Sequence, residues 1–223
     1  MLQRIAWTVV IVASLLAVSA ARAAEPRFEL SVMGGTTASD GVDGPAVTIV
    51  NVGTFDSIDH EDSGSWGIRA AYLIDSNLEA GVLFDQQPTT LQISGSKTVD
   101  LGDQSVSNVH VFAAYSFLEP EAKVRPYLLA GLGATVYGTL DVNVEGYEKS
   151  IDGESKFSPT FGAGAKMFLN PKLGLRLEGR VTPTYIKSDP VGVYGDPYWG
   201  YWVVEEAQYA NQLELAAGVI VRF

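Results

Sequence analysis

Hydrophobic and polar residues alternate with a period of two along most of the chain. At its C-terminal end, Leu213, Leu215 and Ala217 share one face, and Gln212 and Glu214 share the other. This period indicates β-strands whose two faces meet different surroundings. Eight segments show the pattern, and we expect strands near residues 27–36, 65–73, 78–86, 106–117, 124–137, 158–168, 173–185 and 209–223.

The links between these segments alternate between short and long. The short links lie near 74–77, 118–123 and 169–172, and the long links span about 37–64, 87–105, 138–157 and 186–208. Outer-membrane barrels have short turns at one end and longer loops at the other. Strands of about 9–11 residues, tilted in the bilayer, are long enough to cross it. The pattern therefore predicts an all-β fold, an eight-stranded antiparallel up-and-down transmembrane β-barrel, and disfavours a soluble sandwich.

The first 23 residues have the parts of a secretory signal. Arg4 supplies a positive charge, residues 5–18 form an apolar run too short for a membrane-spanning helix, and Ala21 and Ala23 frame a cleavage site. We expect residues 1–23 to be a signal peptide and residues 24–223 to be the barrel domain. An uncleaved membrane anchor is the less favoured interpretation.

The charge of the chain is concentrated in the long links. The 223 residues carry a formal net charge of −11, and the four long links hold 17 acidic and 4 basic residues. This acidic balance argues against a nucleic-acid partner, which needs a basic face. The chain has no Cys, so a thiolate nucleophile, a disulfide and a Cys-ligated metal are excluded. We expect no cofactor and no metal.

Several stretches resemble a known family. They are VRPYLLAGLGAT at 124–135, FGAGAK at 161–166, LGLRLEGR at 173–180 and GVIVRF at 218–223. They are similar to the small eight-stranded outer-membrane β-barrels, which include the membrane domain of outer membrane protein A and outer membrane proteins X and W. The resemblance implies a monomer in the outer membrane of a Gram-negative bacterium, with periplasmic termini and extracellular long loops. It implies outer-membrane lipid and lipopolysaccharide as partners, and the barrel-assembly machinery and periplasmic chaperones during biogenesis.

The C-terminus resembles the assembly signal of this family. A terminal aromatic residue preceded by hydrophobic residues at alternate positions is similar to the signal that the insertion machinery reads. The matching positions here are Tyr209, Val219, Val221 and Phe223.

The polar face of the predicted strands should point into the barrel. An eight-stranded interior is just wide enough for side chains to fill it, and ions buried there need partners. We therefore expect a ladder of ion pairs, with Glu178 close to Lys166 or Arg180 and Glu79 close to Arg69. The ladder residues are Arg69, Glu79, Lys166, Arg176, Glu178, Arg180, Glu214 and Arg222, and Arg27, Glu29 and Asp85 should also point inward.

Two interpretations of the lumen stay open. A static polar core is favoured over a gate whose ion pairs exchange. The inward glycines Gly131, Gly133, Gly162 and Gly164 leave room that water could fill. The leading hypothesis is thus a non-enzymatic structural or surface-interaction barrel with a largely plugged lumen. The alternative is a narrow channel for ions or small apolar solutes.

A lipid-modifying enzyme is a third hypothesis, and the least favoured. It would need a His within about 3 Å of its nucleophile. His60 falls in the first long link, and His110 shares a strand face with Ser116. Residues six apart on a strand lie about 20 Å apart, so His110 and Ser116 cannot meet.

Two long links carry further candidate sites. Asp59, Glu61 and Asp62 flank His60, and an oxygen-rich cluster of this kind suits hard cations such as Ca²⁺, although a solvated acidic loop is favoured. Five aromatic residues fall within 193–203. They could form a binding surface, but the aromatic girdle of a membrane barrel is the favoured interpretation. Trp66, Phe84, Tyr115, Phe117, Phe161 and Tyr185 fit such girdles as well.

Overall fold

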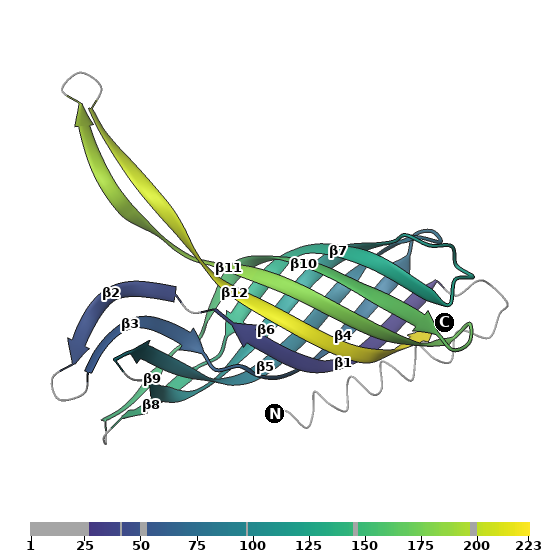
Figure 1. Ribbon diagram of the computed structural model, residues 1–223, viewed down its shortest axis with the longest axis horizontal. Coiled ribbons are helices and arrows are strands. Elements are labelled where there is room, and N and C mark those ends of the chain that lie inside the picture. The colour runs from purple at the N-terminus through teal and green to yellow at the C-terminus, as the bar shows by residue number, and fades with distance from the viewer. Residues whose placement is uncertain (1–26, 41, 50–52, 97, 145–146, 197–199) are drawn as a thin grey trace.

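A computed structural model shows a closed antiparallel β-barrel with hairpins rising from one end (Figure 1). It describes residues 27–223 except 41, 50–52, 97, 145–146 and 197–199, so the predicted signal peptide lies outside the described residues. The barrel strands are β1 (Phe28–Ser39), β4 (Ser63–Leu73), β5 (Leu78–Gly95), β6 (Val99–Ser116), β7 (Val124–Tyr137), β10 (Glu154–Phe168), β11 (Leu173–Asp196) and β12 (Gly200–Arg222).

The strand register closes the barrel. A circuit of paired residues leaves β10 at Phe157 and returns to β10 at Met167 after passing once through each of the other barrel strands. Its members in between are Ala134, Val109, Phe84, Ile68, Val32, Val219 and Leu175. The return point lies ten residues along β10 from the start, which is the stagger of the barrel. The eight-stranded antiparallel barrel that the period of two predicts is therefore confirmed.

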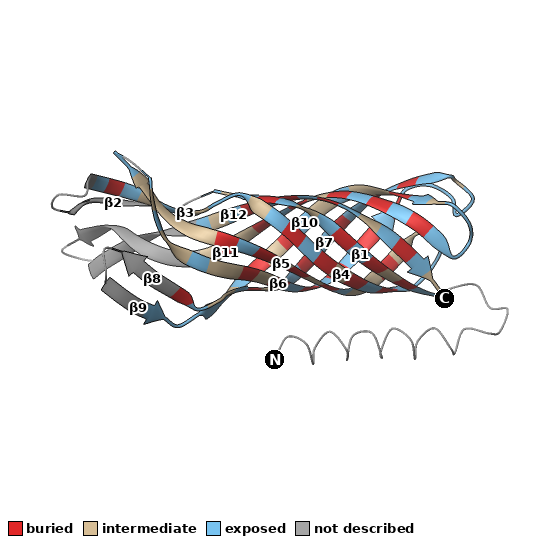
Figure 2. Ribbon diagram, turned by 90° about the horizontal axis from the view of Figure 1, so that it is seen from below, coloured by how far each residue is buried: buried red, intermediate tan, exposed pale blue. Residues whose placement is uncertain are grey.

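Buried and exposed residues alternate along the barrel strands (Figure 2). The exposed residues include many large apolar side chains, whereas most of the buried residues are polar or charged. On β11, for example, Leu177 is 65% exposed whereas its neighbour Arg176 is 2% exposed. This arrangement is the inverse of a protein that faces water, and it matches a barrel surrounded by hydrocarbon with a polar interior.

The two ends of the barrel differ. At the short-turn end, the links 74–77, 117–123 and 169–172 lie close to the predicted turns. At the opposite end, which we call the hairpin end, the predicted long loops are largely β-structure. Residues 87–95 and 99–105 extend β5 and β6. Two further hairpins form from β2 (Val42–Ile49) with β3 (Gly53–His60) and from β8 (Leu140–Val144) with β9 (Tyr147–Ile151). The strands β11 and β12 continue past the barrel as a long hairpin (Figure 1). Antiparallel pairing continues past the barrel wall because a hairpin satisfies its own backbone hydrogen bonds.

The seam between β10 and β11 is incomplete. The ladder between β10 and β11 ends at Phe161 and Val181. Odd-numbered residues hydrogen-bond across this seam, since the amide of Leu169 in the adjoining turn donates to the first residue of β11 at 2.9 Å. The next bonding pair in this register would be Pro159 and Pro183, and neither has an N–H. Beyond this proline pair, β10 pairs with β7 and β11 pairs with β12.

The turn between β4 and β5 is fixed by Asp75. Its Oδ1 accepts hydrogen bonds from the backbone N–H groups of Asn77 (2.7 Å) and Leu78 (2.8 Å). These bonds favour the carboxylate and lower the pKa of Asp75 below its ordinary value. The turn is thus stabilised at and above the ordinary aspartate pKa, and this stabilisation is lost as the pH falls through the lowered pKa. An NMR titration of the Asp75 carboxyl carbon should show the lowered midpoint, and an ordinary midpoint would contradict this geometry.

Candidate functional site

Charged side chains occupy the interior in layers that follow the strands. On β11, Arg176, Glu178 and Arg180 come in this order from the short-turn end, and all three are buried. Each of the three belongs to a different group of interior charges. The group nearest the short turns, which we call the turn layer, consists of Glu29, Glu79, Arg125, Lys166, Arg176 and Arg222. The middle pair consists of Arg69 and Glu178, and the upper group consists of Asp85, Arg180 and Glu214.

In the turn layer, two carboxylates share three cations. Lys166 Nζ lies 2.9 Å from Glu29 Oε1 and also donates to Glu79. Arg176 donates to Glu29 and has its Nη2 3.6 Å from Glu79 Oε1. Arg222 Nε donates to Glu29 Oε2 at 3.1 Å. A carboxylate so surrounded is held rigidly, because each of its oxygens has a charged donor.

The middle pair is bidentate. Arg69 Nη1 and Nη2 donate to the two oxygens of Glu178 at 2.7 and 2.6 Å. The Tyr127 hydroxyl also donates to Glu178, and the Arg69 guanidinium lies 4.8 Å from the centre of the Phe112 ring. Gly164 makes room for Tyr127, since a Cβ there would lie 2.6 Å from the tyrosine hydroxyl oxygen. The parallel fork and the adjacent rings fix both ions in place.

The upper group places one arginine between two carboxylates. Arg180 Nη2 donates to both Asp85 and Glu214. Asn108 donates to Asp85 Oδ2 at 2.8 Å, and the Ser65 hydroxyl donates to Glu214 Oε1 at 3.1 Å. The oxygen of each carboxylate that does not face Arg180 therefore accepts a hydrogen bond from a neutral donor.

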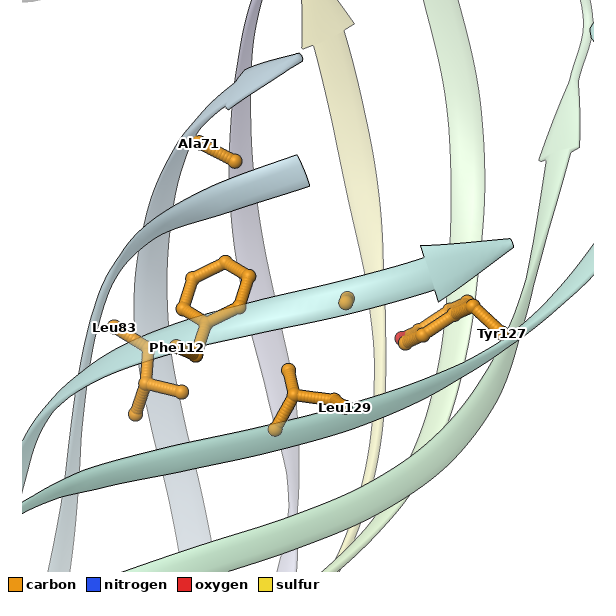
Figure 3. Packing of buried hydrophobic residues seen from close by; sticks show 6 residues of the cluster. Ala71, Leu83, Phe112, Tyr127 and Leu129 are labelled. Atoms are coloured by element: carbon orange, nitrogen blue, oxygen red, sulfur yellow. The ribbon is translucent and has the colours of Figure 1, made fainter. Parts of the chain in front are cut away.

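An apolar cluster lies beside the middle pair in the interior. It consists of Ala71, Leu83, Phe112, Ala114, Tyr127 and Leu129. Figure 3 shows Leu83, Phe112 and Leu129 on neighbouring strands, with Tyr127 further along. The cavity against Arg69, Glu178 and Arg180 measures about 10 Å³. Such a space holds about one water molecule.

The structure places the predicted ladder residues inside the barrel, Arg222 being only partly buried; it keeps the predicted proximity of Glu178 to Arg180 but changes the other partners. Glu79 contacts Lys166 and not Arg69, and Glu178 contacts Arg69, with Arg180 at 4.0 Å and without Lys166. Sequence order does not show these partners, because a closed barrel brings β4 and β11 together across the lumen. Glu29 and Asp85 are buried as predicted, but Arg27 is exposed and donates to the Tyr72 hydroxyl at 3.2 Å.

Two interior residues were not predicted, although the alternation along their strand indicates them. Arg125 and Tyr127 are buried on β7, at alternate positions on the same face as Leu129. The period of two in the segment 124–137 was enough to place them inside. Of the glycines predicted to leave room for water, Gly133 faces the His110 ring, since a Cβ there would lie 2.8 Å from it.

His110 contacts a serine of another strand and not Ser116 of its own strand. Its Nε2 lies 3.0 Å from Ser158 Oγ on β10, and also 3.0 Å from the Ser158 carbonyl. The His110 Nδ1 is buried and has no hydrogen-bond partner among the described residues. A serine nucleophile needs a base that is oriented by a carboxylate or an equivalent group on the other ring nitrogen. The described residues therefore do not form a catalytic triad around His110.

The candidate sites of the long links are only partly described. His60 Nε2 lies 2.9 Å from Gln104 Oε1, and Asp62 accepts a bond from the Ser39 amide at 3.2 Å. Among the described residues, no group of three or more His, Asp or Glu side chains is placed to hold a metal ion. The side chains of the aromatic run 193–203 lie outside the described residues.

Aromatic side chains gather in pairs toward both ends of the barrel. Tyr115 contacts Phe117, and Phe28 contacts both Tyr72 and Phe223, near the short-turn end; toward the hairpin end, Trp66 contacts Phe84 and Tyr185 contacts Tyr209. Paired bands of this kind are typical of the two interfaces of a membrane barrel.

No helix in the described part of the chain is long and apolar enough to cross a membrane.

Comparisons with known proteins agree with this architecture. The structure is similar to OprG from Pseudomonas aeruginosa, with a TM-score of 0.58 and 11% sequence identity over 87% of this chain and 97% of that one. Neisserial surface protein A gives a TM-score of 0.52 and 18% identity over 88% and 97% of the two chains. A major outer membrane protein from Thermus thermophilus gives 0.52 and 13%, over 88% and 99%. No curated protein sequence matches the chain.

Identities this low show a shared fold, and the family follows from the sequence match. The model of the outer membrane protein beta-barrel domain matches residues 8–223, which is nearly the whole chain. The chain therefore belongs to the outer membrane protein β-barrel family.

Proposed function

We propose that this chain is a non-enzymatic outer-membrane barrel with a structural or surface-interaction role, and that its own ion pairs close the lumen. The observation that carries the proposal is the middle pair, because the bidentate contact of Arg69 with Glu178 spans the interior beside a cavity of only about 10 Å³. Breaking such a buried pair is costly, so a static plug is favoured over an exchanging gate.

The outward surface supports the interaction part of the proposal. The hairpins rise from one end of the barrel, and the links that form them hold the excess of acidic residues. We place the short-turn end in the periplasm and the hairpin end outside the cell, where acidic side chains can meet the divalent cations of lipopolysaccharide. Neisserial surface protein A, one of the similar structures, is by its name a surface protein.

Single-channel recording in a planar bilayer tests the plug. The refolded barrel is expected to give no regular openings, because a cavity the size of one water offers no path for a hydrated ion. A heat-modifiable band on a gel must show that the inserted protein is folded. Regular openings by folded protein would contradict the proposal and make a narrow channel the better description.

A further inference from the structure

The interior charges of the described residues are not balanced layer by layer. The turn layer holds four cations (Arg125, Lys166, Arg176 and Arg222) but only two carboxylates, Glu29 and Glu79. The middle pair is neutral, and the upper group has one cation and two carboxylates. Counting the partly buried Arg222, the turn layer therefore carries an excess of two positive charges at the short-turn end.

Arg125 is the cation without a carboxylate. It is 2% exposed, and its Nη2 donates to the backbone carbonyl of Ser76 in the adjoining turn. No described carboxylate lies within ion-pair distance of it, and its buried Nε has no hydrogen-bond partner. In the strand register, Lys166 on β10 lies opposite both Arg125 on β7 and Arg176 on β11. Three buried cations therefore stand side by side on adjacent strands.

Arg176 has unused donors as well. Its side chain is fully buried, yet its Nε and Nη1 have no hydrogen-bond partner among the described residues. Glu29 is engaged by Lys166, Arg176 and Arg222, and Glu79 is engaged by Lys166 although its Oε1 has no hydrogen-bond partner. Two carboxylates cannot neutralise the four cations of the layer. Buried donors without acceptors and buried charges without partners both destabilise a fold.

We infer that the turn layer is a binding site for a small inorganic anion of about the size of chloride, held by the guanidinium groups of Arg125 and Arg176. A water molecule would satisfy the unused N–H groups but would leave the excess charge, whereas an anion satisfies both. A tightly packed interior suits a monatomic ion better than a large one.

The test measures how the stability of the barrel depends on chloride. The purified barrel is unfolded with urea at a series of chloride concentrations, with gluconate keeping the ionic strength constant. A ligand that binds one site of the folded state alone raises the folding equilibrium constant about tenfold for each tenfold rise in its concentration above the dissociation constant. Wild type should show this slope, whereas a flat response would overturn the proposal.

Two variants separate the site from general salt effects. Arg125→Gln removes one excess cation and should abolish the chloride dependence. Arg27→Gln is the matched control, because Arg27 lies at the same end but is exposed, and it should keep the wild-type slope. Equal slopes in the two variants would count against the site.

Bromide can locate the anion site in the wild-type barrel, without any variant. Crystals of the wild-type barrel grown in bromide should give an anomalous peak in contact with the guanidinium groups of Arg125 and Arg176. Should Arg125→Gln fail to fold, this measurement stands alone, and a turn layer without a bromide peak would overturn the proposal.

Discussion

Replacing Glu178 with alanine is expected to lower the free energy of unfolding of the barrel by about 3–5 kcal/mol. The substitution leaves the Arg69 guanidinium buried without its bidentate partner and removes the acceptor of the Tyr127 hydroxyl. An uncompensated charge in a closed interior has no water to solvate it. Urea unfolding followed by tryptophan fluorescence in lipid vesicles measures the change.

Two further variants show whether the loss of the ion pair causes the lower stability. The double substitution Arg69→Met with Glu178→Leu removes both charges and should regain most of the lost stability, since apolar replacements of a buried pair are often neutral or stabilising. Glu154→Ala breaks the exposed pair with Lys156, 3.0 Å apart, and should change stability by less than about 1 kcal/mol. If Glu178→Ala cost no more than Glu154→Ala, the middle pair would not hold the lumen closed.

Replacing Phe223 with alanine is expected to remove most folded barrel from the outer membrane of expressing cells while the purified chain still refolds in detergent. The backbone of Phe223 exchanges two hydrogen bonds of 3.0 Å with Phe28, and alanine can make both. What the variant loses is the terminal aromatic ring, which we propose as part of the assembly signal. Quantifying the heat-modifiable band from outer-membrane fractions gives the result.

Phe28→Ala is the control for this experiment. The rings of Phe28 and Phe223 stack with centroids 6.3 Å apart, so either substitution removes the same contact. Only Phe223→Ala alters the C-terminal residue. A similar loss of folded barrel in both variants would attribute the effect to the stack, and normal membrane levels of Phe223→Ala would contradict an assembly signal.

The sequence determines the strands and their faces more clearly than it determines the contacts between them. Alternation along β12 places Glu214 inside and Leu215 outside because a strand reverses its side chains at each residue. The partner of Arg69 cannot be found in this way. It depends on the stagger of ten residues, which brings Glu178 from the far side of the lumen and leaves Lys166 to Glu79.

The long links show a second limit of the pattern. Polar and turn-forming residues suggested loops over 87–105, yet β5 and β6 pair through most of this range. Outside the bilayer both faces of a hairpin can be polar, so alternation disappears although the strands continue. The seam between β10 and β11, by contrast, has a signal in the sequence that our sequence analysis did not use, because prolines within strands mark places where a ladder is interrupted.

The proline pair has a consequence for how copies of this barrel meet. Closing a sheet into a barrel removes its edges, and an interrupted ladder restores a short edge on each side of the gap. Exposed edges invite a strand of another molecule to pair and so promote aggregation. At the gap between β10 and β11, however, Pro159 and Pro183 occupy the first unpaired bonding positions, and neither can donate. The same residues that interrupt the wall therefore weaken its exposed edges as a template for another chain.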